Sequence, residues 1–194
     1  HDKPMYWPRT GNEMKKSGPT GYSGCEDPRL VEIDGRVYMT YTAYNGIEAP
    51  RVAVSSIAVD DFLKHDWKKW AQPEMLTPQG VDDKDSCIFP EKIKGKYAVL
   101  HRVSHHICLD YLDSLDFSKD KVMRCIEVLG PRPGMWDGEK VGIGGPVIKT
   151  DHGWLMMYHG VSQTGVYTVG AALLKIDDPA TVIARTTDPL IVPT

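Results

Sequence analysis

The chain has 194 residues, of which 41% are hydrophobic and 25% are charged, and its formal net charge at pH 7 is −3. This balance provides no basic stripe for nucleic acid, and no run of 18 apolar residues is present to span a membrane. We therefore expect a globular protein without nucleic-acid or membrane partners, and a homo-oligomer remains open.

The first predicted elements are two strands joined at Asp34-Gly35. An Asp-Gly pair between two apolar runs is typical of a tight hairpin turn. Directly before this hairpin stands the segment Gly24-Cys25-Glu26-Asp27-Pro28-Arg29. Because proline restricts the residue before it, we expect Asp27 to be held in an extended conformation. We interpret Asp27 as a positioned acid; a salt-bridged turn is the alternative.

The hairpin pattern returns twice along the chain. The turn glycine Gly35 is followed by Gly95 and Gly153, at steps of 60 and 58 residues. Four short strands per repeat are typical of a β-propeller blade. The chain is therefore predicted to be all-β and a single propeller domain, with blades at about residues 21–80, 81–135 and 136–194. An ordinary β-sandwich whose turns coincide is the alternative.

The cysteines form neither a CxxC pair nor a zinc spacing. We expect small buried thiols in a cytosolic protein, and hence a cytoplasmic location. A disulfide between Cys25 and Cys87, which both stand near predicted first strands, is the alternative.

Charged and aromatic residues recur at the same edge of each repeat. In a propeller, equivalent edges converge on the central axis, so these residues should meet in space. An acid facing several cations is typical of an acid catalyst beside an anion site. The residues are Glu26, Asp27 and Arg29 in the first repeat, Lys84, Asp85, His101 and Arg102 in the second, and Trp136, Lys140 and His159 in the third.

Several of these segments resemble glycoside hydrolase family 130, the family of β-mannoside phosphorylases and β-1,2-mannosidases. The resemblance implies a five-bladed β-propeller, of which this chain is expected to supply about three blades. It rests on Gly24–Arg29, on Lys84–Ile93, on Leu100–Arg102, on Gly142–Val147 and on Gly153–Val161.

The resemblance also implies roles for single residues. Asp27 matches the family's general acid. Four residues fall where the family binds phosphate: Lys84, Arg102, Lys140 and His159. We expect contacts with the sugar substrate from Glu26, Arg29, Tyr41, Asp85, His101 and Trp136. Trp136 is the predicted sugar platform, and Arg29 is expected to pair with Glu26 or with backbone, since a guanidinium beside Asp27 would lower the pKa of a group that must donate a proton.

The implied reaction is an inverting phosphorolysis of β-mannosides that gives mannose 1-phosphate. Inorganic phosphate is the expected co-substrate, and no cofactor or metal is expected. An inverting hydrolase needs a second carboxylate to activate water, whereas a phosphorylase replaces that base with an anion site. The alternatives are a β-mannoside hydrolase of the same family and a non-catalytic sugar-binding propeller.

Overall fold

The computed structural model describes residues 4–16, 22–118 and 124–193. Residues 21 and 194, the outer bounds of the predicted repeats, lie outside this range. The described chain is all-β apart from a one-turn helix, α1 (Val59–Leu63), and a short 3-10 helix, η1 (Trp67–Lys69). No helix within the described residues has both the length and the apolar character that crossing a bilayer requires.

The strands form three antiparallel sheets. The first sheet contains, in spatial order, β1 (Gly24–Ile33), β2 (Arg36–Tyr44), β3 (Arg51–Ala58) and β4 (Glu74–Met75). The second contains β5 (Asp83–Ile93), β6 (Lys96–Val103), β7 (His106–Leu112) and β8 (Ile126–Leu129). The third contains β10 (Ile148–Thr150), β11 (Gly153–Val161), β12 (Tyr167–Lys175) and β13 (Asp178–Arg185), and β9 (Lys140–Ile143) also pairs with β11.

The hairpin turns follow from local sequence. Asp34 and Gly35 have φ angles of 51° and 75°, and Lys94 and Gly95 have 51° and 82°. Two successive residues with positive φ make the turn whose twist matches that of the flanking strands. The predicted turns at Gly35 and Gly95 are therefore confirmed.

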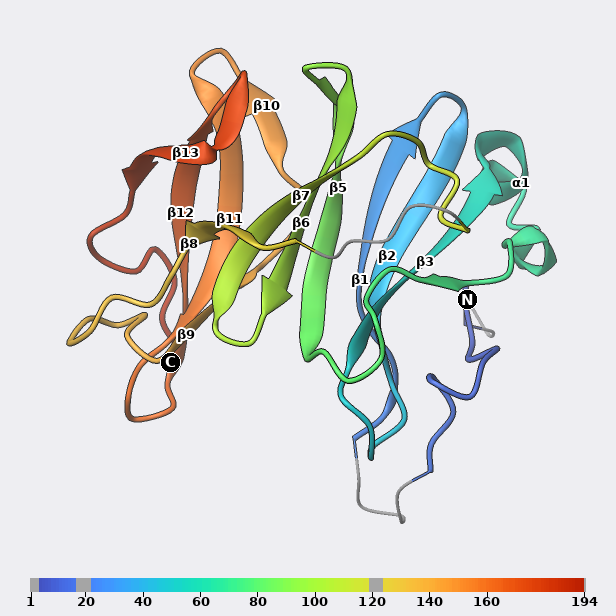
Figure 1. The fold of residues 1–194 in the computed structure, drawn as a ribbon, viewed down its shortest axis with the longest axis horizontal. Coiled ribbons are helices and arrows are strands. Elements are labelled where there is room, and N and C mark those ends of the chain that lie inside the picture. The colour runs from blue at the N-terminus through green and yellow to red at the C-terminus, as the bar shows by residue number, and fades with distance from the viewer. Residues whose placement is uncertain (1–3, 17–21, 119–123, 194) are drawn as a thin grey trace.

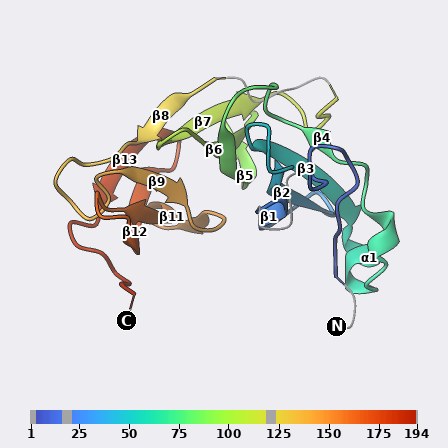
Figure 2. The same cartoon turned by 90° about the horizontal axis from the view of Figure 1, so that it is seen from below.

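The three sheets stand side by side in chain order (Figure 1). Seen from below they form an arc, with the first strands β1 and β5 near its inner side and β4 and β8 farther out (Figure 2). Apolar side chains fill the space between neighbouring sheets: Val54 of the first sheet packs with Ile88 of the second, and Phe89 lies edge-on to Trp154 of the third, with ring centroids 5.0 Å apart. This packing fixes the inner strands relative to one another.

The cysteines differ from the prediction. Cys108 and Cys125 form a disulfide, whereas Cys25 and Cys87 are free. The expectation of reduced thiols is therefore wrong for Cys108 and Cys125. The pairing of β7 with β8 explains the bond, because Cys108 in β7 lies opposite Glu127, two residues beyond Cys125.

Candidate functional site

Two equivalent β-bulges prepare the site. In the first sheet the pairing register shifts between Glu26 and Arg29, so that Asp27-Pro28 oppose a single residue of β2. In the second sheet it shifts between Lys84 and Cys87, so that Asp85-Ser86 oppose a single residue of β6. A bulge leaves an extra residue unpaired and re-aims its side chain.

The two bulge carboxylates share one backbone conformation. Asp27 has a φ of 52° and Asp85 a φ of 51°, in the left-handed region that Asp and Asn tolerate better than other residues with side chains. The extended conformation expected for Asp27 is therefore wrong, because the bulge overrides the restriction imposed by Pro28. Asp27 is exposed, whereas Asp85 is only 2% exposed.

Asp85 lies where the three sheets meet. Its Oδ2 is 3.3 Å from Arg102 Nε of β6 and 3.9 Å from His159 Nε2 of β11. Its Oδ1 is 3.6 Å from Arg29 Nη2 of β1. Side chains from all three sheets therefore converge on one buried carboxylate, which lies beneath the surface rather than in direct reach of a sugar, contrary to the prediction for Asp85.

Arg29 is bound to backbone carbonyls of the protein. It is 7% exposed, its Nη1 donates to the carbonyl of Asp27 at 2.8 Å, and its Nη2 donates to the carbonyl of Ile143 in the third sheet. The expected pairing with backbone is confirmed, but the expected contact with substrate does not fit, because both terminal nitrogens are already bound. Arg29 instead ties the Asp27 bulge to the third sheet.

Glu26 and Lys84 lie next to these groups. Lys84 pairs with Arg102 across β5 and β6, so two cationic side chains stand on opposed residues. Glu26 is half-buried, and burial raises the pKa of its carboxyl above the usual range; the charge of Lys84 opposes this shift and that of Asp27 adds to it. Glu26, Asp27 and Lys84 are therefore close enough to interact electrostatically.

The third sheet contributes His159 and Lys140. Burial lowers the pKa of His159; Asp85 raises it, and Arg102, Arg29 and Lys140 lower it further. His159 also lies beside Tyr167 of β12, with ring centroids 5.8 Å apart, and the ammonium of Lys140 lies 5.1 Å from the centroid of the same tyrosine.

Tyr167 was not predicted as a site residue. It is 54% exposed and presents a hydroxyl-bearing ring next to two predicted phosphate ligands. The sequence contains one weak signal for it, a lone aromatic residue two positions after Gly165.

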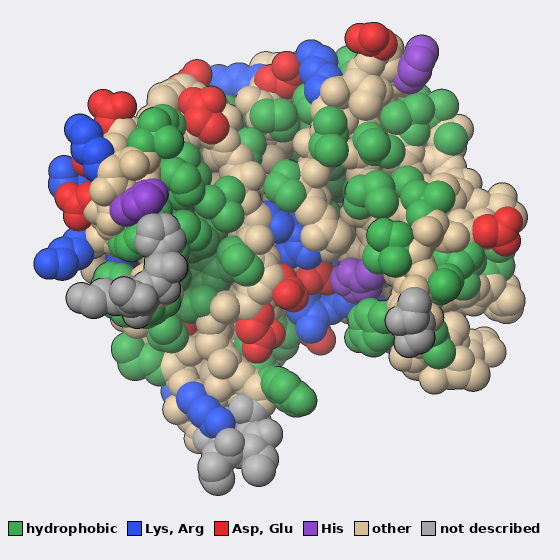
Figure 3. Space-filling view, turned by 180° about the vertical axis from the view of Figure 1, so that it is seen from behind, with side chains coloured by type: hydrophobic (Ala, Val, Ile, Leu, Met, Phe, Trp, Pro, Cys, Tyr) green, Lys and Arg blue, Asp and Glu red, His purple; other side chains and the backbone are tan. Residues whose placement is uncertain are grey.

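The surface reflects this arrangement. Figure 3 shows basic, acidic and histidine side chains gathered near the middle of one face, between regions of mainly hydrophobic and uncharged atoms. Because cations outnumber carboxylates among the converging residues, the chemistry of the site suits an anion. No group of three or more His, Cys, Asp or Glu side chains that could hold a metal is found among the described residues.

Two predicted substrate contacts are buried elsewhere. Tyr41 is 1% exposed; its hydroxyl donates to the buried Glu13, and it shares a 2.9 Å hydrogen bond with Tyr6. His101 is 2% exposed, with Nδ1 3.0 Å from the carboxylate of Asp83. The prediction that Tyr41 and His101 contact substrate is corrected accordingly, because each ring fills the interior behind a bulge.

Trp136 packs against the third sheet. Its ring stacks on Tyr158, with centroids 5.5 Å apart, and its indole N–H donates to the carbonyl of Thr187 at 2.8 Å. A side chain added at Gly160 or Gly170 would collide with this ring. One face of Trp136 therefore packs on the third sheet and its N–H is bound to backbone, while the residue is only half-buried; its role as a sugar platform stays a prediction.

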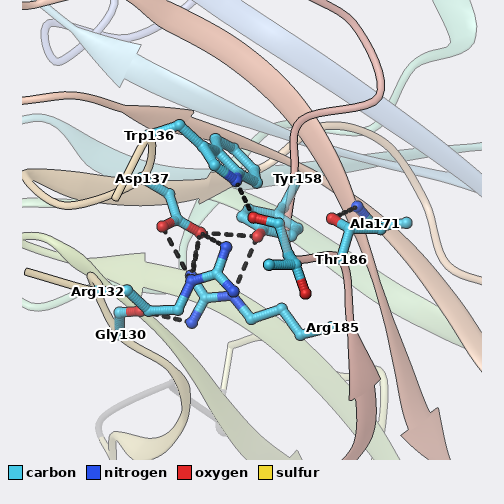
Figure 4. A network of polar contacts seen from close by, with 9 residues as sticks. Gly130, Arg132, Trp136, Asp137, Tyr158, Ala171, Arg185 and Thr186 are labelled. Atoms are coloured by element: carbon cyan, nitrogen blue, oxygen red, sulfur yellow. Dashed lines mark hydrogen bonds and ion pairs between the residues drawn. The ribbon is translucent and has the colours of Figure 1, made fainter. Parts of the chain in front are cut away.

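The residue after it, Asp137, anchors the same loop (Figure 4). Its Oδ2 accepts from Arg132 at 2.8 Å, from Arg185 at 2.6 Å and from the hydroxyl of Tyr158 at 2.8 Å. Burial opposes ionisation of Asp137, but hydrogen bonds from Arg132 and Tyr158 and the charge of Arg185 keep its pKa below the usual value. This network fixes the segment that leads into β9 and Lys140.

Comparisons with known proteins identify the family of the chain. The family model Glyco_hydro_130, described as beta-1,4-mannooligosaccharide phosphorylase, matches residues 1–194. A 1,2-beta-oligomannan phosphorylase of Thermoanaerobacter sp. (strain X514) is 36% identical over 99% of this chain and 58% of its own length. A beta-1,2-mannobiose phosphorylase of the same strain is 36% identical over 88% of this chain and 53% of its own length.

A solved structure is similar over the whole chain. It is that of beta-1,2-mannobiose phosphorylase from Listeria innocua in complex with beta-1,2-mannobiose, with a TM-score of 0.78 and 30% identity over 100% of this chain and 50% of that one. The chain thus spans between half and three fifths of the length of these relatives. With a family model that matches from the first residue to the last, the chain belongs to glycoside hydrolase family 130.

Proposed function

We propose that the protein catalyses the inverting phosphorolysis of β-mannosides. Asp27 donates a proton to the glycosidic oxygen, directly or through a sugar hydroxyl, as the bond from that oxygen to the anomeric carbon breaks. A phosphate oxygen forms the new bond to the anomeric carbon from the opposite face. The products are mannose 1-phosphate and the free acceptor sugar, and the proton of hydrogen phosphate replaces the one that Asp27 gave up.

One observation carries this proposal: Arg102 of the second sheet and His159 of the third converge on the buried Asp85, and Arg29, which also faces Asp85, donates to the backbone of the exposed Asp27 bulge. Arg102 is ion-paired through Nε, and within the described residues its terminal nitrogens have no other ion pair or hydrogen bond. A guanidinium offers a fork that matches a phosphate. Lys84, Lys140 and His159 supply further donors around it, so phosphate can be held without a second carboxylate to act as base.

The relatives bear on the linkage. Those named for β-1,2-mannosides are 35% to 36% identical to this chain, whereas the beta-1,4-mannooligosaccharide phosphorylase of Ruminococcus albus is 29% identical. We therefore extend the proposal to β-1,2-linked mannosides as substrates. Inorganic phosphate is the co-substrate, and the reaction requires no cofactor.

The same proposal includes the architecture. The three sheets succeed one another around an arc, with β1 and β5 on its inner side (Figure 2), which is how blades surround a central axis in a propeller. We take them as three blades of a five-bladed propeller whose axis passes by the site.

The test measures mannose 1-phosphate released from β-1,2-mannobiose and β-1,4-mannobiose, with and without inorganic phosphate. We expect phosphate-dependent release from the β-1,2-linked disaccharide. Asp27→Asn should abolish it, because the amide cannot donate the proton, while Asn tolerates the same left-handed backbone.

Asp34→Asn is the matched control, since Asp34 is an exposed aspartate in the turn of the same hairpin, with a φ of 51°. It should leave activity unchanged. Release of free mannose without phosphate would show that the protein is a hydrolase and refute the proposal. An active Asp27→Asn variant would show that Asp27 is not the general acid.

A further inference from the structure

We propose that Asp85 is a positioning residue, whose buried carboxylate holds Arg102 and His159 in place for the incoming phosphate. The inference rests on the proposed function and deepens it. It assigns the positioning of the phosphate ligands to a residue that itself contacts neither sugar nor phosphate.

The first argument is burial. Asp85, Arg102 and Arg29 are 2%, 4% and 7% exposed, and these oppositely charged groups approach within 3.3 Å and 3.6 Å of one another. A buried guanidinium without a counter-ion is costly, and removing one partner of such a group leaves the others uncompensated. Asp85 is the carboxylate that both ion pairs share.

The second argument is direction. Asp85 engages Arg102 at Nε, not at the terminal fork. The contact fixes the Arg102 side chain at Nε and leaves its two terminal nitrogens without a hydrogen bond or ion pair to any described residue. Asp85 Oδ2, Arg102 Nε and Arg29 Nε are buried without a hydrogen-bond partner of good geometry, so the three groups are arranged by charge and position. Such an arrangement suits a site that is completed when an anion binds.

The third argument is space. In the third sheet Gly142 lies directly opposite His159, where the other two sheets place a bulge aspartate. A Cβ at Gly142 would lie 2.5 Å from Asp85 Oδ2 and 2.5 Å from His159 Nε2. The carboxylate therefore occupies the volume that a side chain of the neighbouring sheet would fill. Asp85 reaches His159 only because residue 142 is glycine.

The fourth argument is the charge around His159. Facing it are Asp85 from β5, Arg102 from β6, Arg29 from β1, Lys140 from β9 and the ring of Tyr167 from β12. Asp85 is the group among them that favours the protonated imidazole, the form in which both ring nitrogens are donors, so that one can face Asp85 and the other a phosphate. Loss of this charge should lower the pKa of His159 further.

The test compares Asp85→Asn with Asp83→Asn in the purified protein. Both remove a buried carboxylate from β5 that lies beside a histidine, but Asp83 pairs with His101 behind the bulge. Asn accepts the left-handed backbone at position 85. We expect Asp85→Asn to raise the KM for inorganic phosphate by about tenfold or more, since charge-assisted hydrogen bonds to the anion are lost. The KM for the mannoside should stay within about twofold, and Asp83→Asn should leave both KM values unchanged.

Two further readouts separate positioning from general damage. The ring signal of His159, assigned in an NMR titration by its absence in His159→Gln, should titrate at lower pH in Asp85→Asn than in wild type. Calorimetric titration with inorganic phosphate should show the same loss of affinity in the absence of sugar.

The outcomes are distinct. Wild-type phosphorolysis combined with an unchanged phosphate KM in Asp85→Asn, or with an unmoved His159 titration, would overturn this inference alone. An equal rise of both KM values would reduce Asp85 to a structural residue. Phosphate-independent turnover by the wild type would overturn the proposed function, and this inference with it.

Discussion

A single methyl group at Gly142 should impair phosphate use. The added carbon of Gly142→Ala would stand 2.5 Å from both Asp85 Oδ2 and His159 Nε2. Ordinary contact distances for carbon are about 3.5 Å, so each side chain must retreat by about 1 Å or the strand must shift.

A displacement of about 1 Å in a catalytic arrangement can cost about 100-fold in rate. We therefore expect kcat/KM for phosphate to fall about 10- to 100-fold, with a loss of about 1–3 kcal/mol in the free energy of unfolding from overpacking. The assay varies phosphate at saturating mannoside and follows mannose 1-phosphate.

Gly145→Ala is the control for this prediction. Gly145 lies three residues further along the same segment, a Cβ there would meet nothing within 4 Å, and its φ is not in the left-handed region. It should behave as wild type. Equal effects of the two substitutions, or an unchanged kcat/KM for phosphate in Gly142→Ala, would refute the argument that His159 and Asp85 depend on the missing side chain.

Three further predictions concern stability, each measured by urea unfolding. The pKa of His159 is lowered in the folded protein, so the unfolded chain binds more protons near the ordinary histidine pKa of about 6.5, and the free energy of unfolding should fall as pH drops through that value. His159→Gln should weaken this dependence. Equal slopes of the free energy of unfolding against pH in both proteins would contradict the prediction. Asp137→Asn leaves two arginines around a buried amide and should cost about 3–5 kcal/mol, whereas the exposed Asp188→Asn should cost little; similar losses for both would count against a structural network. Cys125→Ser removes the disulfide to Cys108, which links residues 17 apart, and should lower the free energy of unfolding by about 3 kcal/mol. A reducing agent that destabilised the variant as much as the wild type would contradict this prediction.

The parts of the fold governed by local chemistry could be predicted from the sequence. Turn residues with positive φ fix the hairpins at Gly35 and Gly95, because few residue types tolerate that backbone. The recurrence of these turns also pointed to the edge where Lys84, Arg102 and His159 gather, since matching positions in repeated units lie at matching places in space.

Two physical causes account for the misassigned residues His101 and Tyr41. Neighbouring residues of a strand point to opposite faces, and a bulge changes that alternation within one step. Arg102 and His101 therefore face different surroundings, although both looked like site residues. Tyr41 is held by Glu13, which is 28 residues earlier in the chain, and no pattern local to Tyr41 could have indicated that partner.

The repeated bulge also determines how the site can be altered. The same backbone step occurs twice, with different surroundings: the carboxylate of Asp27 is exposed to solvent, whereas that of Asp85 is a buried counter-ion. Left-handed backbone accepts Asp, Asn and Gly at modest cost. Exchanges among these three residues at positions 27 and 85 should therefore vary charge while leaving the path of the chain intact, which makes the two bulges natural positions for redesigning the reaction separately from the fold.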